Sequence, residues 1–302
     1  MSTGLRLGFD VGGTNVRAGL VRADGTLAAP LYDVPREGDL IRQLADAAEE
    51  FHAAARRAGR SIAGAGIALP GSLDPDTGVV SSAPGAVELL GLDPRDIVLG
   101  PVTVTHVVND ADAALLAEWC HGAARGARHA VGVFAGTGIG GGAVVDGRPL
   151  LGATGLAGEV GHLPLVPDGP DCPCGGTGCL EQAASGTAVA RWYVVRAGRK
   201  LPGGAAEVAA VARGGDRLAQ QAFAEAGAWL GVGVAALVNL LNPQVVVVGG
   251  GMAAAWDLFG AVLEDTARRR AMPLPARAVR IVPGTLGRAA GVIGAARPPS
   301  PH

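Results

Sequence analysis

Residues 162–179 contain the side chains best suited to bind a transition metal. His162, Cys172, Cys174 and Cys179 bring one imidazole and three thiols into a segment rich in Pro and Gly. Cytosolic disulfides are rare, and Cys172 and Cys174 lie too close in sequence for an ordinary one. The alternative is a group of separate buried thiols. The donor set favours a closed tetrahedral zinc site, which would order a segment that has little apolar content of its own.

Carboxylates lie on both sides of this segment. Glu159 precedes His162 by three residues, and Glu181 follows the last cysteine by two. A rigid zinc-bound loop would present both carboxylates and one edge of the imidazole to a small polyol. Farther upstream, Asn109 and Asp110 end a predicted buried strand and open a predicted helix. Asp110 is either an N-cap or a general base for a substrate hydroxyl that Asn109 orients.

Two glycine-rich turns occupy matching places in the chain. Gly12–Thr14 follows Asp10, and a second run covers 136–142. The second run matches the spacing of a dinucleotide fingerprint, but it opens a strand and a hairpin where that fingerprint must open a helix. Consecutive backbone N–H groups in such turns can bind phosphate, with help from the Thr137 hydroxyl. Asp10 is placed to hold a magnesium ion through water.

The composition excludes several classes of function. The chain has 302 residues, of which 49% are hydrophobic and 17% charged, so it is globular. A net charge of -2 predicts no nucleic-acid partner. The single lysine, Lys200, is followed by Leu201, which excludes a G-x-x-x-x-G-K-[ST] phosphate loop.

The apolar segments predict a protein of the cytoplasm. The first ten residues contain no apolar stretch of the kind that export signals carry. An uncharged stretch, Ala226–Trp256, is interrupted by Asn242 and Pro243 and is therefore predicted to be a buried helix and strand. We expect no membrane partner.

The hydrophobic pattern predicts an α/β protein with a repeated arrangement of elements. Strand, glycine turn and strand over 5–22 return over 130–145, which places a boundary near Arg125. The expected lobes are 1–125, with the first phosphate turn and Asp110, and 126–302, with the second turn and the zinc loop. The last helix could pack back on the first lobe. Other expected elements are an amphipathic helix over 40–55, strands over 62–69 and 103–108, and a helix over 111–125 closed by Gly126.

Several motifs between residues 5 and 251 occur in the order of a known family. They are Asp10–Arg17, Leu69–Gly71, Asn109–Asp110, Gly136–Gly142, Glu159–His162, Cys172–Glu181 and Val245–Gly251. The sequence resembles the ROK family of sugar kinases and repressors, within the actin-like, hexokinase-like ATPase superfamily. The resemblance implies two actin-like, ribonuclease H-like ATPase lobes with a cleft between them and a zinc-bound loop. It also implies ATP and Mg²⁺ as cofactors besides structural Zn²⁺, and a homodimer or homotetramer.

The resemblance assigns roles by position. Asp110 is the expected catalytic base, and the expected sugar-binding residues are Gly71, Asn109, Glu159, His162 and Glu181. The expected contacts to phosphate, magnesium and nucleotide are Asp10, Gly12, Gly13, Thr14, Arg17, Thr137, Gly138, Gly249, Gly250 and Gly251. The expected metal ligands are His162, Cys172, Cys174 and Cys179.

One departure from the family pattern concerns the substrate. Family glucokinases usually follow an Ala-Pro pair with an Asn that contacts the sugar, whereas Ala83-Pro84 is followed here by Gly85. The expected reaction is ATP-dependent phosphorylation of a hexose, with glucose at its 6-hydroxyl as the simplest case. The alternatives are fructose, mannose, allose or N-acetylmannosamine as acceptor, polyphosphate as donor, and a sugar-sensing transcriptional regulator. A regulator of this family carries a DNA-binding segment ahead of the first strand, and only four residues precede Leu5.

Overall fold

The computed structural model describes residues 4–74, 77–83, 87–93 and 96–297. Its contacts divide the chain into two compact units. The first comprises the described parts of 1–125, 151–157 and 288–302, and the second comprises 126–150 and 158–287. The sequence placed 151–157 in the second lobe, whereas the structure groups this connection with the first unit. The C-terminal helix, which the sequence allowed to pack back on the first lobe, is also grouped with the first unit.

The first unit is built on a mixed sheet in which three parallel strands end at one edge. The strand order is β3-β2-β1-β4-β8-β7. The β1–β4 and β4–β8 pairs are parallel, and β1–β2, β2–β3 and β7–β8 are antiparallel. The strands are β1 (Leu5–Val11), β2 (Asn15–Val21), β3 (Tyr32–Pro35), β4 (Ile62–Leu69), β7 (Val98–Leu99) and β8 (Val102–Asn109), with a separate pair β5 (Ser72–Leu73) and β6 (Val80–Ser82).

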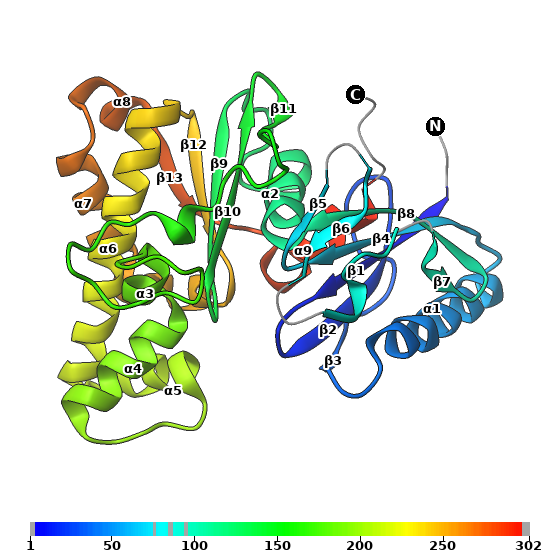
Figure 1. The fold of residues 1–302 in the computed structure, drawn as a ribbon, viewed down its shortest axis with the longest axis horizontal. Helices are drawn as coiled ribbons and strands as arrows, with labels where there is room; N and C mark the ends of the chain where they lie inside the picture. Colours follow the sequence, from blue (N-terminus) through cyan, green and yellow to red (C-terminus); the bar gives the residue numbers. More distant parts are fainter. Residues whose placement is uncertain (1–3, 75–76, 84–86, 94–95, 298–302) are drawn as a thin grey trace. The chain divides into compact units, whose positions relative to one another are not determined.

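The helices of the first unit pack on this sheet (Figure 1). Helix α1 (Leu40–Arg57) begins at the N-cap Asp39 and buries the stripe that its sequence period predicts: Leu40, Leu44, Ala47, Ala48, Phe51 and Ala55. The remaining elements are the short η1 (Val87–Leu89), α2 (Asp110–His121), η5 (Gly287–Ala289) and α9 (Ala290–Ala296).

Glycines explain why the last helix belongs to the first unit. A Cβ added at Gly8 of β1 would lie 2.0 Å from the Val292 carbonyl oxygen of α9, and one at Gly66 of β4 would lie 2.0 Å from that of Ala295. All seven residues of α9 are buried. The backbone of α9 therefore lies directly on β1 and β4, where no larger residue fits.

The second unit repeats the strand order of the first. Its sheet is β11-β10-β9-β12-β13, with β9–β10 and β10–β11 antiparallel and β9–β12 and β12–β13 parallel. The strands are β9 (Ala130–Ala135), β10 (Ile139–Val145), β11 (Arg148–Pro149), β12 (Val245–Gly249) and β13 (Arg280–Pro283). The predicted α/β class is confirmed, and so is the predicted return of strand, glycine turn and strand.

Helices flank this second sheet, and the long α6 runs along it (yellow in Figure 1). The elements are η3 (Val160–His162), α3 (Leu180–Ala184), α4 (Gly186–Ala197), α5 (Gly204–Arg213), α6 (Arg217–Leu241), η4 (Gly251–Ala255), α7 (Trp256–Arg270) and α8 (Pro273–Ala278). Among the described helices, only α6 has the length and hydropathy to cross a membrane, and half of its most apolar window is buried in the unit.

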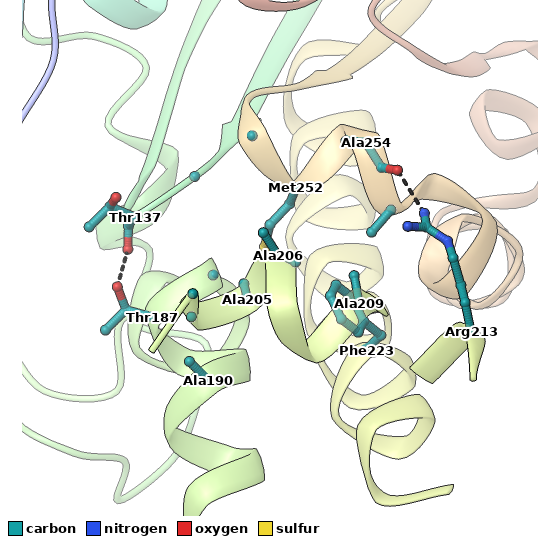
Figure 2. Close-up of a pocket in the computed structure, with 16 residues that line it drawn as sticks. Thr137, Thr187, Ala190, Ala205, Ala206, Ala209, Arg213, Phe223, Met252 and Ala254 are labelled. Carbon is teal, nitrogen blue, oxygen red and sulfur yellow. Dashed lines mark hydrogen bonds between the residues drawn. The ribbon is translucent and has the colours of Figure 1, made fainter. Parts of the chain in front are cut away.

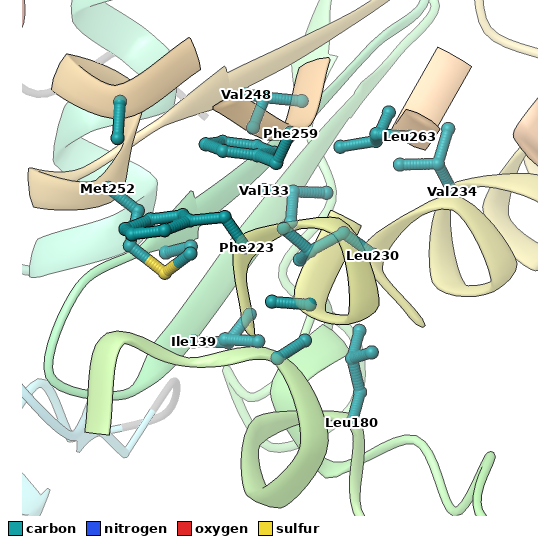
Figure 3. Close-up of a cluster of buried hydrophobic side chains, with 14 of the residues drawn as sticks. Val133, Ile139, Leu180, Phe223, Leu230, Val234, Val248, Met252, Phe259 and Leu263 are labelled. Atoms are coloured by element: carbon teal, nitrogen blue, oxygen red, sulfur yellow. The ribbon is translucent and has the colours of Figure 1, made fainter. Parts of the chain in front are cut away.

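The core of the second unit explains that burial. Phe223 and Leu230 of α6 pack with Phe259 and Leu263 of α7 in one apolar cluster (Figure 3). The Phe223 and Phe259 rings stack with centroids 6.4 Å apart. Burying large aromatic and aliphatic side chains is the main source of stability for such a helix pair. The uncharged stretch after Ala226 is therefore a core helix followed by the buried β12, as predicted.

Two predicted boundaries were wrong. Residues 139–142 of the predicted glycine loop belong to β10, because they pair with β9 and because Gly141 leaves room for Val160, whose Cγ2 would lie 2.4 Å from an added Cβ. Helix α2 ends at His121 with Gly122 as C-cap, whereas the sequence suggested Gly126. In the first case tertiary packing decides the boundary. In the second an earlier glycine ends the helix.

Candidate functional site

Two of the predicted sugar-binding residues, Gly71 and Asn109, lie together at the carboxyl ends of the parallel strands β4 and β8. The side chain of Asn109 donates from Nδ2 to the carbonyl oxygen of Gly71 at 2.9 Å. Gly71 has φ +133, and an added Cβ would lie 1.9 Å from the carbonyl oxygen of Ser82. Only glycine fits that position.

Asp110 begins α2 at the same edge. Asn109, not Asp110, is the N-cap, because its Oδ1 accepts hydrogen bonds from the N–H groups of Ala111 (2.9 Å) and Asp112 (3.1 Å). The Oδ1 atom of Asp110 accepts from Ala111 at 2.8 Å, and the residue is half-buried. The capping role that the sequence left open for Asp110 thus belongs to its neighbour.

Asp10 lies at the end of β1 in a chain of alternating charges. Its carboxylate accepts from Arg17 Nη1 at 3.1 Å, and Arg17 Nε reaches Asp33 Oδ2 at 3.3 Å. Asp33 also accepts from Asn15 Nδ2 at 2.9 Å and from Arg288 Nη2 at 2.5 Å. Burial raises the pKa of Asp10, while Arg17 opposes the rise. Arg17 therefore holds the Asp10 carboxylate from one side.

The turn after Asp10 is accessible to solvent. Gly12 N–H donates to the carbonyl oxygen of Asn15 at 2.9 Å, and Gly13 and Thr14 are exposed. A Cβ at Gly13 would meet nothing within 4 Å. The first predicted phosphate turn thus presents accessible backbone beside a largely buried carboxylate, which suits a phosphate and an Mg²⁺ ion.

The predicted metal ligands lie together in the second unit. The ligand atoms of His162, Cys172, Cys174 and Cys179 all lie within 4.8 Å of one another. Cys174 Sγ and Cys179 Sγ are 3.6 Å apart, and Cys172 Sγ is 3.7 Å from His162 Nδ1. Zinc bonded to two sulfur atoms at tetrahedral angles separates them by about 3.8 Å. The cluster therefore fits a zinc ion.

The chemistry of the thiols supports the same ion. Burial and the neighbouring thiols raise the pKa of Cys179 to about 12 without a metal, so its thiolate needs a cation. Gly178 has φ +69, and its Cβ would lie 2.0 Å from the Val166 carbonyl oxygen. The loop is thus shaped around the cluster by a glycine that cannot be replaced.

Zinc on Nδ1 of His162 would leave the proton of the ring on Nε2. That nitrogen lies 3.9 Å from Oε2 of Glu159, whose side chain is 43% exposed. A metal on one ring nitrogen fixes the tautomer and makes the other nitrogen a hydrogen-bond donor. With zinc on Nδ1, a hydrogen-bond donor and a carboxylate would therefore lie side by side at an accessible position.

Glu181 lies against the beginning of β10. Its Oε2 accepts from the N–H of Ile139 at 2.8 Å. From the other side, an added Cβ at Gly161 would lie 2.0 Å from the carbonyl oxygen of Ile139, so the turn of Glu159 and His162 also packs there. The structure thus brings Glu159, His162 and Glu181 to one end of β10.

A cavity of about 510 Å³ lies within the second unit and is lined by glycine, alanine and a few larger side chains (Figure 2). Its walls include Gly136 and Thr137 of the second glycine turn and Gly251 after β12. Its volume lies in the range of about 300 to 1,000 Å³ that is usual for small-molecule sites. Two motifs that are 114 positions apart therefore meet at one cavity, counting from Thr137 to Gly251.

Two helix N-termini also face this cavity. Gly186 and Thr187 begin α4, and Gly203 and Gly204 begin α5. Helix N-termini carry partial positive charge and favour anions. The Thr187 hydroxyl donates to the Thr137 carbonyl oxygen at 2.7 Å and so ties α4 to the glycine turn (Figure 2).

These helix starts and Arg213 were not predicted from the sequence. The Ser185-Gly186-Thr187 run is a helix-start signal that could have pointed to α4, since Ser185 caps it. Arg213 lines the cavity from the end of α5, donates to the Ala254 carbonyl oxygen at 2.8 Å and pairs with Asp257 at 2.6 Å. No sequence signal identified Arg213, because its partners lie more than 40 positions away.

Close packing against β9 explains two glycines of the predicted adenosine motif, Gly249 and Gly250. Gly250 has φ +81, and its Cβ would lie 2.3 Å from the Ala135 carbonyl oxygen, while a Cβ at Gly249 would lie 2.5 Å from the Phe134 ring. Gly251 lines the cavity, whereas Gly249 and Gly250 hold the turn against β9. Ala83 is buried, and the prediction for Pro84 and Gly85 falls outside the described residues.

Comparison with known proteins identifies the family. The family model described as "ROK family" matches residues 6–297. The chain is 33% identical to the glucokinase of Thermotoga maritima, over 96% of this chain and 95% of that protein. It is similar to the crystal structure of a ROK family glucokinase from Streptomyces griseus with glucose and AMPPNP (TM-score 0.83, 31% identity, 97% of this chain and 98% of that one). It also resembles the ROK hexokinase from Thermus thermophilus (TM-score 0.79, 36% identity, 97% and 96%). As its motifs predicted, the chain belongs to the ROK family.

Proposed function

We propose that this protein transfers the terminal phosphate of ATP to a hexose in the cytoplasm, most simply to the 6-hydroxyl of glucose. The observation that carries the proposal is the cavity of about 510 Å³ with Gly136, Thr137 and Gly251 at its wall. Its largely apolar lining suits a purine, and two helix N-termini suit the phosphates that follow it. Relatives named as glucokinase and a similar structure with glucose and AMPPNP support the same reaction.

In this proposal the acceptor hydroxyl loses its proton to Asp110. The hydroxyl oxygen bonds to the terminal phosphorus, the bond from that phosphorus to the bridging oxygen breaks, and ADP leaves. Asn109 is fixed by its bond to Gly71 and by capping α2, so it can orient the hydroxyl beside Asp110. Glu159, His162 and Glu181 would bind the other hydroxyls of the sugar.

The phosphate groups would meet two turns. Asp10, with Gly12, Gly13, Thr14 and Arg17, would contact the transferred phosphate and Mg²⁺, and Thr137 with Gly138 would contact the nucleotide phosphates. Gly249, Gly250 and Gly251 would approach the adenosine. Magnesium, when bound, offsets negative charge on the phosphates. Zinc on His162, Cys172, Cys174 and Cys179 would order the sugar-binding loop and take no part in transfer.

The proposal is tested by a panel of acceptors and donors. The purified protein is assayed with ATP and glucose, fructose, mannose, allose or N-acetylmannosamine, and kcat/KM is compared. A second series holds the best sugar constant and replaces ATP by polyphosphate. We expect ATP-dependent formation of a hexose 6-phosphate with one ADP for each sugar phosphate.

The outcomes separate the alternatives. A preference for polyphosphate would refute the assignment of the cavity to a nucleotide. Sugar binding without any turnover would refute the kinase assignment and favour a sugar-sensing protein. A hexose other than glucose with the highest kcat/KM would revise the acceptor and keep the reaction class.

A further inference from the structure

Phosphate binding alone does not explain why residue 138 is a glycine. Glycines in phosphate turns usually supply a positive φ or close approach of the backbone to a ligand. Gly138 has no φ in the left-handed region, so alanine could adopt its backbone conformation. Its neighbour Gly136 also has an ordinary φ, and a Cβ there would meet only the Gly251 nitrogen at 3.9 Å. The space around an added Cβ therefore distinguishes Gly138 from Gly136.

The surroundings of Gly138 are the carboxylate of Glu181. A Cβ added at Gly138 would lie 2.3 Å from Oε2 of Glu181 and 3.1 Å from its Cδ. The same Oε2 accepts the N–H of Ile139 at 2.8 Å. The carboxylate thus lies against the turn through Oε2, in space that exists because residue 138 has no side chain, while Oε1 lies farther away at 3.8 Å from the added Cβ.

This contact leaves one carboxylate oxygen for another partner. Among the hydrogen bonds of the described residues, Glu181 Oε1 accepts none, while Oε2 is held by the turn. A carboxylate fixed through one oxygen loses little further freedom when the other binds a hydroxyl. The turn therefore pre-orients Glu181 for a substrate.

The turn is tied to its surroundings at three points. Gly136 carbonyl accepts from Gly186 N–H at 2.7 Å, Thr137 carbonyl accepts from the Thr187 hydroxyl, and Ile139 N–H donates to Glu181. The first two bonds lead to α4 and the cavity, and the third leads to α3 beside the zinc cluster. One short turn thus connects the cavity to the zinc-bound loop.

We propose that Gly138 is a positioning residue for the hexose: its missing side chain lets Glu181 lie on the β9–β10 turn with one oxygen directed to the sugar. The inference rests on the proposed function, in which Glu181 binds a hexose hydroxyl. It assigns to the sugar side a glycine that the motif alone assigns to phosphate.

The test is Gly138→Ala with Gly136→Ala as matched control. An added methyl at position 138 meets the end of a flexible side chain, so Glu181 moves and the fold is retained. We expect Gly138→Ala to raise the Kd of D-glucose, measured by calorimetry without nucleotide, about tenfold, the effect of losing one charged hydrogen bond. Gly136→Ala should change that Kd less than about twofold, and both variants should keep the zinc content of the wild type.

A double-mutant cycle asks whether Gly138 acts through Glu181. Glu181→Asp shortens the side chain by one methylene and leaves room for a methyl at position 138. We expect Glu181→Asp alone to weaken glucose binding, and Gly138→Ala to have less than about a twofold further effect in that background. Equal losses in both backgrounds would overturn the proposal, as would wild-type glucose affinity in Gly138→Ala.

Two further outcomes remain decisive. If Gly138→Ala does not fold, the test uses Glu181→Asp and measures hydrogen exchange of the Ile139 amide. Loss of protection of this amide together with loss of glucose affinity supports the proposal. Loss of protection with unchanged glucose affinity overturns it. If the wild-type protein binds no hexose, the proposed function itself fails. Glucose binding by the wild type with no effect of Gly138→Ala refutes the positioning role alone.

Discussion

Asp10 is a largely buried carboxylate, 14% exposed, whose negative charge destabilises the folded state. Burial raises its pKa above that of the unfolded chain, and the Arg17 guanidinium only partly opposes the rise. Ionised Asp10 therefore destabilises the folded protein at a pH above both values, and the penalty disappears as the pH falls below them. A charge kept at such a position indicates a functional role.

The variant Asp10→Asn separates stability from activity. We expect the Tm of Asp10→Asn to exceed that of the wild type at pH 7, because the variant removes the destabilising charge and Arg17 keeps Asp33 as a partner. The difference in Tm should shrink toward pH 3.8, because Asp10 of the wild type becomes protonated there. Phosphoryl transfer should fall about 10²-fold or more. Scanning fluorimetry between pH 4 and 8 and a kinase assay measure both.

Asp24 supplies the control for Asp10. It is exposed, and hydrogen bonds from Thr26 lower the pKa of Asp24, so its charge favours the folded state. Asp24→Asn should not raise the Tm at pH 7. A lower Tm for Asp10→Asn than for the wild type at pH 7 would contradict the assigned sign.

The lowered pKa of His106 leads us to expect that acid destabilises the first unit. Burial, with help from Arg6, lowers its pKa to about 4. The unfolded chain takes up this proton near pH 6.5 and the folded chain only near pH 4, so stability is lost as the pH falls between these values. The shift corresponds to about 3 kcal/mol.

Urea unfolding of the wild type and of His106→Asn at pH 7 and at pH 4.5 tests this expectation. The variant should lose less of its free energy of unfolding on acidification than the wild type. An equal loss in both proteins would assign the acid sensitivity to other groups.

Single residues also mark the limit of prediction from sequence. The spacing of Asp10, Asn109, Glu159 and the cysteines could be read directly, because each belongs to a short motif. The pairing of Arg17 with Asp33 and of Asp33 with Arg288 could not, because the partners lie on separate elements that only the folded sheet brings together.

At the scale of elements, the proposed function predicts that the loop with His162, Cys172, Cys174 and Cys179 couples metal binding to sugar affinity. Cys174→Ser removes one ligand of a closed site, so His162 loses the anchor that fixes its ring. We expect loss of zinc, a lower Tm and a 10- to 100-fold weaker affinity for glucose, with a smaller change for a non-hydrolysable ATP analogue. Metal analysis, scanning fluorimetry and calorimetry measure these effects.

Cys120 is the matched control, since it lies in α2 outside the cluster. Cys120→Ser should keep the zinc and the glucose affinity of the wild type. Native protein that is active and contains no zinc would refute the role of the loop.

The starts of α4 and α5 form the wall of the cavity, so a large side chain there should exclude a nucleotide. Ala190 of α4 lines the cavity. We expect Ala190→Phe to raise the KM for ATP about tenfold or more while glucose binding without nucleotide is retained. Steady-state kinetics with varied ATP and calorimetry with glucose measure the two effects.

The same helix offers the control. Val195 is 73% exposed, so Val195→Phe places an equal ring on the outer face of α4 and should leave the KM for ATP unchanged. Full activity of Ala190→Phe with ATP would exclude this cavity as the nucleotide site.

Elements differ in how well the sequence specifies them. Helix α1 was predicted with all of its buried positions, because an amphipathic period and an N-cap determine it locally. The start of β10 was not, because glycines read as a loop and their place in the sheet follows from pairing with β9 and from packing of Val160. The placement of α9 also depends on glycines far along the chain.

At the scale of the whole molecule, one strand order occurs twice. The order β3-β2-β1-β4-β8 in the first unit matches β11-β10-β9-β12-β13 in the second, with antiparallel hairpins and parallel partners at equivalent places. In each unit a glycine turn joins the first two strands. The repeat explains why two matching glycine turns could be recognised from the sequence, since each joins the first two strands of its unit.

The most direct test of the account is the activity of Asp110→Asn. The amide keeps an oxygen for the N–H of Ala111, which Asp110 Oδ1 accepts at 2.8 Å, so the start of α2 is preserved. The account predicts that kcat for ATP and glucose falls by about 10² or more while the Kd of glucose stays within about twofold of the wild type. Full activity of Asp110→Asn would contradict the assignment of the base and, with it, the proposed mechanism of phosphoryl transfer.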